Sequence, residues 1–300
     1  MKNILSLTVL ALSCSACAVA PMMISSAVSK MDMNDVQNLV TKVQKASDGQ
    51  RDLTQAEEIA LGEGVASNML GAAPLLQDKK AQRYVNQVGL WLAMQTERAD
   101  LPWHFAVLDD NEFNAFAAPG GYVFITRGLL LSMRNEAELA GVLAHEIAHV
   151  VRKHQLEALK TVNGKNALAD FASSLATQAP VAAKVGQLTP ALAKLANAAT
   201  EMYTRGLDKN DEYEADRMAV VIAARAGYDP YGLPAVLQSL QTVNPSYPGL
   251  ALMFKTHPSF ASRLDLLAKV MDKPFDAYEN QPNVAARFKS QVTMPKLATK

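Results

Sequence analysis

The sequence has few cysteines, no excess of charge of either sign, and no hydrophobic run long enough to cross a membrane. Lys plus Arg equals Asp plus Glu at 29 each, and no basic run occurs, which argues against nucleic acid or an anionic membrane surface as a partner. No stretch of about 18 apolar residues is present, which argues against a transmembrane helix. No 34-residue repeat occurs either, so we expect no helical-repeat module.

Residues 1–20 have the pattern of an export signal. Lys2 supplies a positive charge, residues 4–12 are apolar, and small residues follow. A frayed N-terminal helix is the simpler alternative. The two cysteines of the chain, Cys14 and Cys17, both lie here, so a processed chain can form no internal disulfide. One of them could carry a lipid, as in bacterial lipoproteins, although neither follows a well-formed lipobox. Plain cleavage is the other route, and either predicts an exported protein of the periplasm or, if lipidated, the outer membrane.

The rest of the chain predicts one large domain with short flanking segments. We expect a linker or surface helix at residues 21–52, a domain at 53–272 and a polar tail at 273–300. Residues 103–108 read as a strand, and β-prone runs on either side of a Pro-Gly-Gly turn at 119–121 indicate a hairpin. Residues 161–200 are rich in alanine and predict short packed helices or, alternatively, a movable flap. The fold class is therefore α+β, mainly helical, with a small sheet.

The segment 145–149 reads His-Glu-Ile-Ala-His within a helix that is apolar on nearly every side. A buried helix should not carry two imidazoles and a carboxylate unless they have partners, since unpaired buried polar groups cost free energy. His145 and His149 lie one turn apart on the same face and can bind one metal ion, while Glu146 can reach a water molecule beside it. This is the H-E-x-x-H pattern of zinc hydrolases. The alternative is a pair of core histidines bonded to backbone.

A catalytic zinc ion usually has three protein ligands and one open position. Glu212 and Asp216 lie one turn apart on a further predicted helix, so one could bind zinc while the other orients a histidine from behind. Spacing alone does not exclude Glu214 as the ligand. A solvated acidic helix face is the alternative.

These motifs resemble a known family. His145 to His149, the later Glu-Tyr-Glu-Ala-Asp at 212–216 and the Asn-Ala-Phe-Ala-Ala-Pro-Gly-Gly run at 114–121 are similar to the zinc metallopeptidases of the CaaX prenyl protease, HtpX and BepA type. Gly-Tyr-Asp-Pro at 227–230 and Thr-His-Pro at 256–258 also match. Since no membrane spans are expected, the exported soluble or lipoprotein members, BepA and LoiP, are the nearer likeness.

The resemblance implies a gluzincin-like domain with one zinc ion per chain. It makes His145, His149 and Glu212 the zinc ligands, Asp216 a helper in catalysis and Glu214 a non-ligand. Glu146 would be the general base that takes a proton from the attacking water. The resemblance also places the strand before the Pro-Gly-Gly turn beside the cleft, where Asn114, Ala115, Phe116 and Ala117 could bind an extended peptide by strand addition.

The function predicted is therefore a zinc endopeptidase of the bacterial cell envelope that cleaves unfolded or misassembled proteins in quality control. The rival is a non-enzymatic, zinc-stabilised chaperone or assembly factor; Glu146 argues against it, because a structural site needs no general base. His257 lies on a loop before Pro258, which favours extended backbone there. It could be solvent-exposed, act as a latch that fills the open metal position, or donate a hydrogen bond to the oxyanion.

Overall fold

A computed structural model describes residues 52–159, 197, 205–243, 250, 255–278 and 280–293. Every described residue belongs to one compact unit, Asp48–Lys300. The predicted export signal, nearly all of the predicted linker and most of the alanine-rich segment lie outside the described residues. Among the helices that are described, none is long and apolar enough to span a membrane.

A three-stranded sheet forms around the predicted hairpin. It contains β1 (His104–Leu108), β2 (Ala115–Ala118) and β3 (Tyr122–Thr126), in the order β1-β3-β2. β1 runs parallel to β3, whereas β2 is antiparallel to β3 with Phe116 opposite Phe124. The 3-10 turn η1 (Pro119–Gly121) joins β2 to β3, and Gly120 and Gly121 there have φ of 76° and 101°. Such positive φ values favour glycine, which explains the Pro-Gly-Gly turn.

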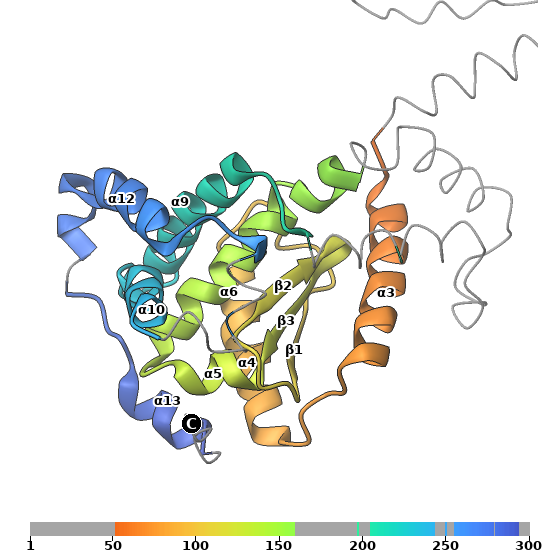
Figure 1. The fold of residues 1–300 in the computed structure, drawn as a ribbon, viewed down its shortest axis with the longest axis horizontal. Helices are drawn as coiled ribbons and strands as arrows, with labels where there is room; N and C mark the ends of the chain where they lie inside the picture. Colours follow the sequence, from red (N-terminus) through yellow and green to blue (C-terminus); the bar gives the residue numbers. More distant parts are fainter. Residues whose placement is uncertain are drawn as a thin grey trace, which may run out of the picture. The chain divides into compact units, whose positions relative to one another are not determined.

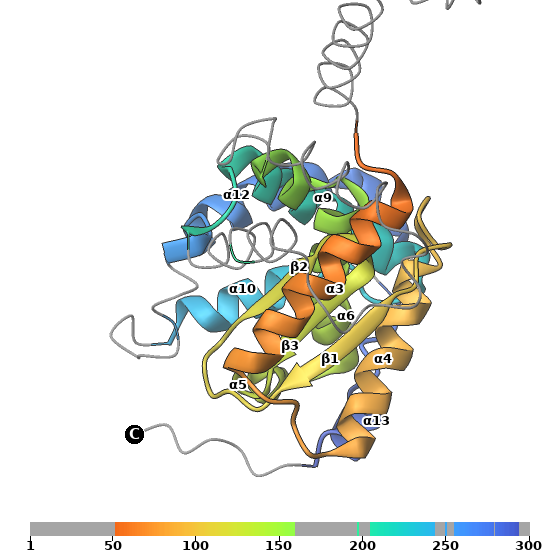
Figure 2. The same cartoon turned by 90° about the vertical axis from the view of Figure 1, so that its right-hand side faces the viewer.

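Helices cover both faces of the sheet (Figures 1 and 2). α3 (Gln55–Ala72) packs on one face, and α4 (Lys79–Ala93) and α6 (Glu136–Val151) pack on the other. α3 begins at a capping box, in which the Thr54 side chain accepts from the Glu57 amide and the Glu57 side chain accepts from the Thr54 amide. The architecture confirms the predicted α+β class, mainly helical with a small sheet beside the H-E-x-x-H helix.

α6 is the central helix, and every one of its residues is buried. Asn135 caps it by accepting from the Glu138 amide. It packs against α9 (Lys209–Arg225) and α10 (Gly232–Gln241), while α12 (Phe260–Met271) lies against α9 and α10; α5 (Arg127–Ser132) precedes it. A Cβ at Gly141 would lie 2.5 Å from the Leu233 backbone nitrogen, so α6 and α10 approach more closely than an alanine allows. Full burial of a side chain such as Leu143 contributes about 1.5–3 kcal/mol.

The segment expected to be a polar tail contains two further elements, η4 (Lys273–Tyr278) and α13 (Ala285–Gln291). Phe275 and Phe288 are buried in the main core. The Phe288 ring meets Tyr84 of α4 edge-on, with a centroid distance of 6.3 Å. Part of this segment therefore packs with the domain, because two aromatic side chains among polar neighbours find apolar surface there.

The first residue of α6, Glu136, is the buried centre of a polar network, here called the Glu136 network (Glu136, Tyr84, Tyr228 and Arg287). The two tyrosine hydroxyls each donate to the carboxylate at 2.7 Å. Arg287 of α13 donates from Nε at 2.5 Å and also from Nη2. Burial alone would raise the pKa of Glu136, but these hydrogen bonds outweigh it and hold the pKa below its usual value.

Candidate active site

α6 carries the two histidines and Glu146 into the interior. His145 and His149 project from one face, and their Nε2 atoms lie 3.1 Å apart. Both rings are nearly inaccessible to solvent, at 4% and 2% exposure. Two imidazole nitrogens so close together, on side chains that the backbone fixes one turn apart, face one shared space.

α9 brings Glu212 to the same space. Its Oε2 lies 3.6 Å from His145 Nε2, and its Oε1 lies 3.5 Å from His149 Nε2. Burial opposes ionisation of Glu212, but the neighbouring histidines, His257 foremost, hold its pKa well below the usual value. The structure thus brings together the three side chains that the resemblance assigns as ligands, although Glu212 is far from the other two in sequence.

Asp216, one turn further along α9, lies behind His145. Its Oδ1 is 3.0 Å from His145 Nδ1, the nitrogen that faces away from Glu212. Arg263 of α12 donates to both Asp216 oxygens, at 2.9 Å from Nε and 2.6 Å from Nη2, and is itself buried. Burial would raise the pKa of Asp216, but Arg263 holds it well below the usual value. A charged Asp216 can accept a hydrogen bond from Nδ1–H of His145. The proton then stays on Nδ1, and Nε2 is available for a metal ion.

Arg263 was not anticipated from the sequence. The signal for it was its place on the same helix face as Phe260 and Leu267, a face that proves to be buried. A guanidinium on a buried helix face requires a carboxylate partner, and that partner is Asp216.

His154 has the corresponding place behind His149 and was also missed. Its Nδ1 lies 2.9 Å from His149 Nδ1, and its Nε2 lies 3.4 Å from a Glu214 oxygen. One consistent proton arrangement runs outward: His149 donates from Nδ1 to His154, which donates from Nε2 to Glu214. Glu214 also pairs with Arg152 at 2.8 Å. It therefore lies on the far side of His149, and its exclusion from the ligands stays a prediction.

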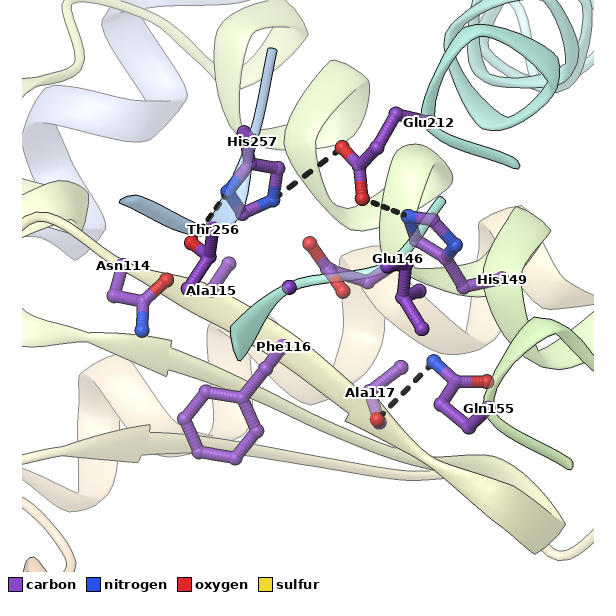
Figure 3. A pocket seen from close by; sticks show the side chains of 12 residues that line it. Asn114, Ala115, Phe116, Ala117, Glu146, His149, Gln155, Glu212, Thr256 and His257 are labelled. Atoms are coloured by element: carbon purple, nitrogen blue, oxygen red, sulfur yellow. Dashed lines mark hydrogen bonds and ion pairs between the residues drawn. The ribbon is translucent and has the colours of Figure 1, made fainter. Parts of the chain in front are cut away.

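His257 faces the cluster rather than bulk solvent. Its Nε2 is 3.5 Å from Glu212 Oε2, and its Nδ1 is 2.9 Å from Thr256 Oγ1 (Figure 3). His145, Glu212 and His257 each offer a ligand atom, and these atoms all lie within 4.8 Å of one another. Whether His257 acts as a latch or as an oxyanion donor stays a prediction.

A metal ion fits this cluster. Glu212 Oε2 is buried and makes no hydrogen bond within the described part of the chain, which is unusual for a buried carboxylate oxygen. A cation would supply the missing interaction. Imidazole nitrogens with one carboxylate are the donors found in catalytic zinc sites. His145 and His149 also have partners for their outer nitrogens, the support that metal-binding histidines normally have.

Glu146 stands beside the cluster without being part of it. It lines the same cavity as His149 and Glu212 (Figure 3). Burial, as the largest cause, raises its pKa to about 7. A carboxylate with that affinity for protons is suited to accept one and return it near neutral pH.

The cavity beside Glu146 is narrow, with about 50 Å³ of free space. All four predicted substrate-binding residues line it, namely Asn114, Ala115, Phe116 and Ala117. A second small cavity of about 30 Å³ adjoins His145 and Glu146 on the side of α10. Its walls are mainly aliphatic: Leu129, Val142, Leu233, Val236, Leu237 and Leu240.

Comparison with known proteins agrees with this geometry. The sequence model that describes peptidase family M48 matches residues 79–271. The "Beta-barrel assembly-enhancing protease" of Escherichia coli K12 is 32% identical over 221 residues, which cover 71% of this chain and 43% of that protein. The protein of the same name from Yersinia pestis is 33% identical, covering 69% and 42%. "Mitochondrial metalloendopeptidase OMA1" of Schizosaccharomyces pombe is 29% identical, covering 60% and 50%. The chain thus spans less than half the length of the first two relatives.

Proposed function

The chain belongs to peptidase family M48, and from that premise we propose that it is a zinc-dependent endopeptidase of the bacterial cell envelope. Its substrates would be unfolded or misassembled proteins, cleaved in quality control. The observation that carries the proposal is the buried Glu212 Oε2, which accepts no hydrogen bond from the described residues and lies close to His145 and Glu146. This combination supplies both a place for a metal ion and a base beside it.

In this proposal His145, His149 and Glu212 hold one zinc ion, and Asp216 orients the His145 ring from behind. Zinc bound there would polarise the scissile carbonyl and lower the pKa of a water molecule to about 7. Glu146 accepts a proton from the water as its oxygen bonds to the carbonyl carbon. The same carboxyl group then gives that proton to the amide nitrogen as the carbon–nitrogen bond breaks.

The substrate chain would bind along β2. An extended peptide added to a sheet edge is recognised mainly through its backbone, so many sequences can bind provided they are unfolded. The relatives named for assembly of β-barrels and for a metalloendopeptidase support a role in processing polypeptides. Export by the predicted signal at residues 1–20, with or without a lipid tether at a cysteine, would place this activity in the envelope.

A non-enzymatic, zinc-stabilised assembly factor is the alternative function. The buried position of Glu146, with its raised pKa and no role as a ligand in the proposed set, favours the hydrolase. The deciding experiment compares casein cleavage and zinc content of wild type and Glu146→Gln. We expect the variant to bind zinc and to turn over about 100-fold more slowly or worse. Equal turnover by the two proteins would refute the mechanism.

The role of His257 can be decided by whether its replacement raises or lowers proteolysis. As a latch that competes for the metal, it should raise proteolysis when replaced in His257→Ala, with zinc content unchanged. As an oxyanion donor, its removal should lower kcat by about 100-fold. We favour the latch, because His257 as a fourth ligand would keep the protease inactive until substrate displaces this histidine. Unchanged casein kinetics would remove His257 from both roles.

A further inference from the structure

β2 directs part of its backbone into the cleft. It is an edge strand of the three-stranded sheet. The Thr126 amide donates to the Asn114 carbonyl at 2.9 Å, so the backbone groups of Asn114 point to β3. Backbone direction alternates along an antiparallel strand, so Ala115 and Ala117 direct their backbone groups to the opposite edge. That edge lies in the cavity lined by Glu146.

Gln155 already donates to this edge. Its Nε2 lies 3.2 Å from the Ala117 carbonyl oxygen (Figure 3). Gln155 follows α6, in a helical stretch that starts at His154, and is only 6% exposed. The side chain therefore takes one of the outward-facing acceptors that a substrate strand would use.

The residue spacing of a strand and the small size of the cavity determine whether a bound peptide meets Gln155. Two residues of a strand span about 6.6–6.8 Å, so a peptide that bonds to Ala115 reaches Ala117 two residues later. The cavity leaves about 50 Å³ of free space, and Gln155 is part of its wall. A peptide long enough to reach Ala117 competes with the Gln155 side chain for the carbonyl oxygen that it needs.

We propose that Gln155 is a specificity-determining residue that limits how far a substrate extends along β2. The inference rests on the proposed function, and it narrows the substrate class. Chains that expose a short extended segment at the scissile bond would bind at Ala115 and leave Gln155 in place. Longer strands must break its hydrogen bond to Ala117 before they bind. The site thereby favours short unfolded segments over long extended strands.

A purely structural role makes a different prediction. Edge strands are often covered so that they do not pair with other chains. If Gln155 does only that, its loss should change stability and should affect peptides of every length equally. Peptide length is therefore the variable that separates the two roles.

The test measures binding rather than cleavage. Fluorescent peptides of increasing length, extended stepwise on either side of one cleavable bond, are titrated by anisotropy into zinc-loaded Glu146→Gln protein with and without Gln155→Ala. We expect Gln155→Ala to tighten binding about 3- to 10-fold for peptides lengthened on one side, the ratio for one neutral hydrogen bond, and to leave the short peptides unchanged. Gln155→Leu, which keeps the bulk but loses the donor, should give a smaller gain with the same length dependence.

Gln281→Ala is the matched control, since Gln281 donates from Nε2 to the Ala224 carbonyl at 3.1 Å and does not line the cavity. It should change no peptide affinity. A uniform change at all lengths, weaker binding of long peptides or no change in Gln155→Ala would each overturn the inference. Wild type that cleaves none of the peptides, while the length effect persists, would refute the hydrolase and leave the role of Gln155 standing. Absence of binding by every peptide would overturn both.

Discussion

Two buried carboxylates, Glu136 of α6 and Glu212 of α9, lie near opposite ends of α6 and differ in their hydrogen bonds. At the N-terminal end, Glu136 receives hydrogen bonds from two tyrosines and an arginine, so both its oxygens have partners. Toward the C-terminal end, Glu212 meets His145 and His149 at 3.5–3.6 Å, and its Oε2 makes no hydrogen bond to any residue described. α6 thus lies between a carboxylate whose two oxygens both accept hydrogen bonds and one whose Oε2 accepts none from the described residues.

This difference in hydrogen bonding distinguishes a carboxylate that stabilises the fold from one that binds a ligand. A carboxylate whose two oxygens both accept hydrogen bonds holds elements together, and the Glu136 network connects α4, α6 and α13. A buried carboxylate oxygen without a partner is costly unless a ligand completes it. Changes at the Glu136 network should therefore alter stability, while changes near Glu212 should alter metal binding.

The largest expected effect is on Glu212. Glu212→Gln should weaken zinc binding by more than about 100-fold, beyond the range for residues that only support a ligand. Glu214→Gln is the matched control on the same helix; it should change zinc affinity little, because Glu214 contacts His154 and Arg152 on the far side of His149. Metal analysis after competition with a chelator measures both. Greater sensitivity of Glu214 would reverse the assignment.

Asp216→Asn should have an intermediate effect. Replacement removes the charged acceptor from His145 Nδ1 and leaves Arg263 buried opposite a neutral amide. We expect zinc affinity to fall by about 10- to 100-fold, as for other residues that orient a metal-binding histidine. Chelator competition again gives the value. An affinity equal to that of wild type would mean that Asp216 supports the fold alone.

Glu136→Gln should have the smallest effect on function, because it acts on the Glu136 network. The substitution removes the buried charge and weakens the hydrogen bonds to Arg287, which we expect to lower the free energy of unfolding by about 1–3 kcal/mol. The folded-state pKa is lowered, so this stabilisation is present above the unfolded-state value of about 4.3 and is lost as pH falls.

Denaturant unfolding at pH 7 and below pH 4 checks this prediction. The difference between wild type and Glu136→Gln should shrink at the lower pH, while zinc content at pH 7 stays unchanged. A variant that loses zinc at pH 7 would break the distinction between the two ends of α6.

The parts of the fold predicted from sequence are those fixed by local signals. The glycines of η1 form the predicted turn through interactions within a few residues. The caps of α6 and α3, Asn135 and Thr54, act over equally short distances. The sheet order and the packing of Phe288 on Tyr84 could not be predicted, because they depend on contacts between distant segments.

The same division holds for the candidate site. His145, Glu146 and His149 follow from helical period alone, and Glu212 was selected over Glu214 only by the family resemblance. Arg263, His154 and Gln155 were missed, since each acts through a partner that only the folded chain brings near. His154 and Gln155 lie just beyond α6, so their proximity in sequence was visible but their direction was not.

The contact of Gly141 with Leu233 has a consequence for how such sequences evolve. No methyl group fits between α6 and α10 at this point, one turn before His145. An alanine there would push α10 outward and widen the aliphatic cavity beside Glu146, of which Leu233 forms part. The atoms in the way are the backbone nitrogen and Cα of residue 233, which a smaller side chain at 233 would not remove. Across the family we therefore expect glycine at position 141 whatever the side chain at position 233.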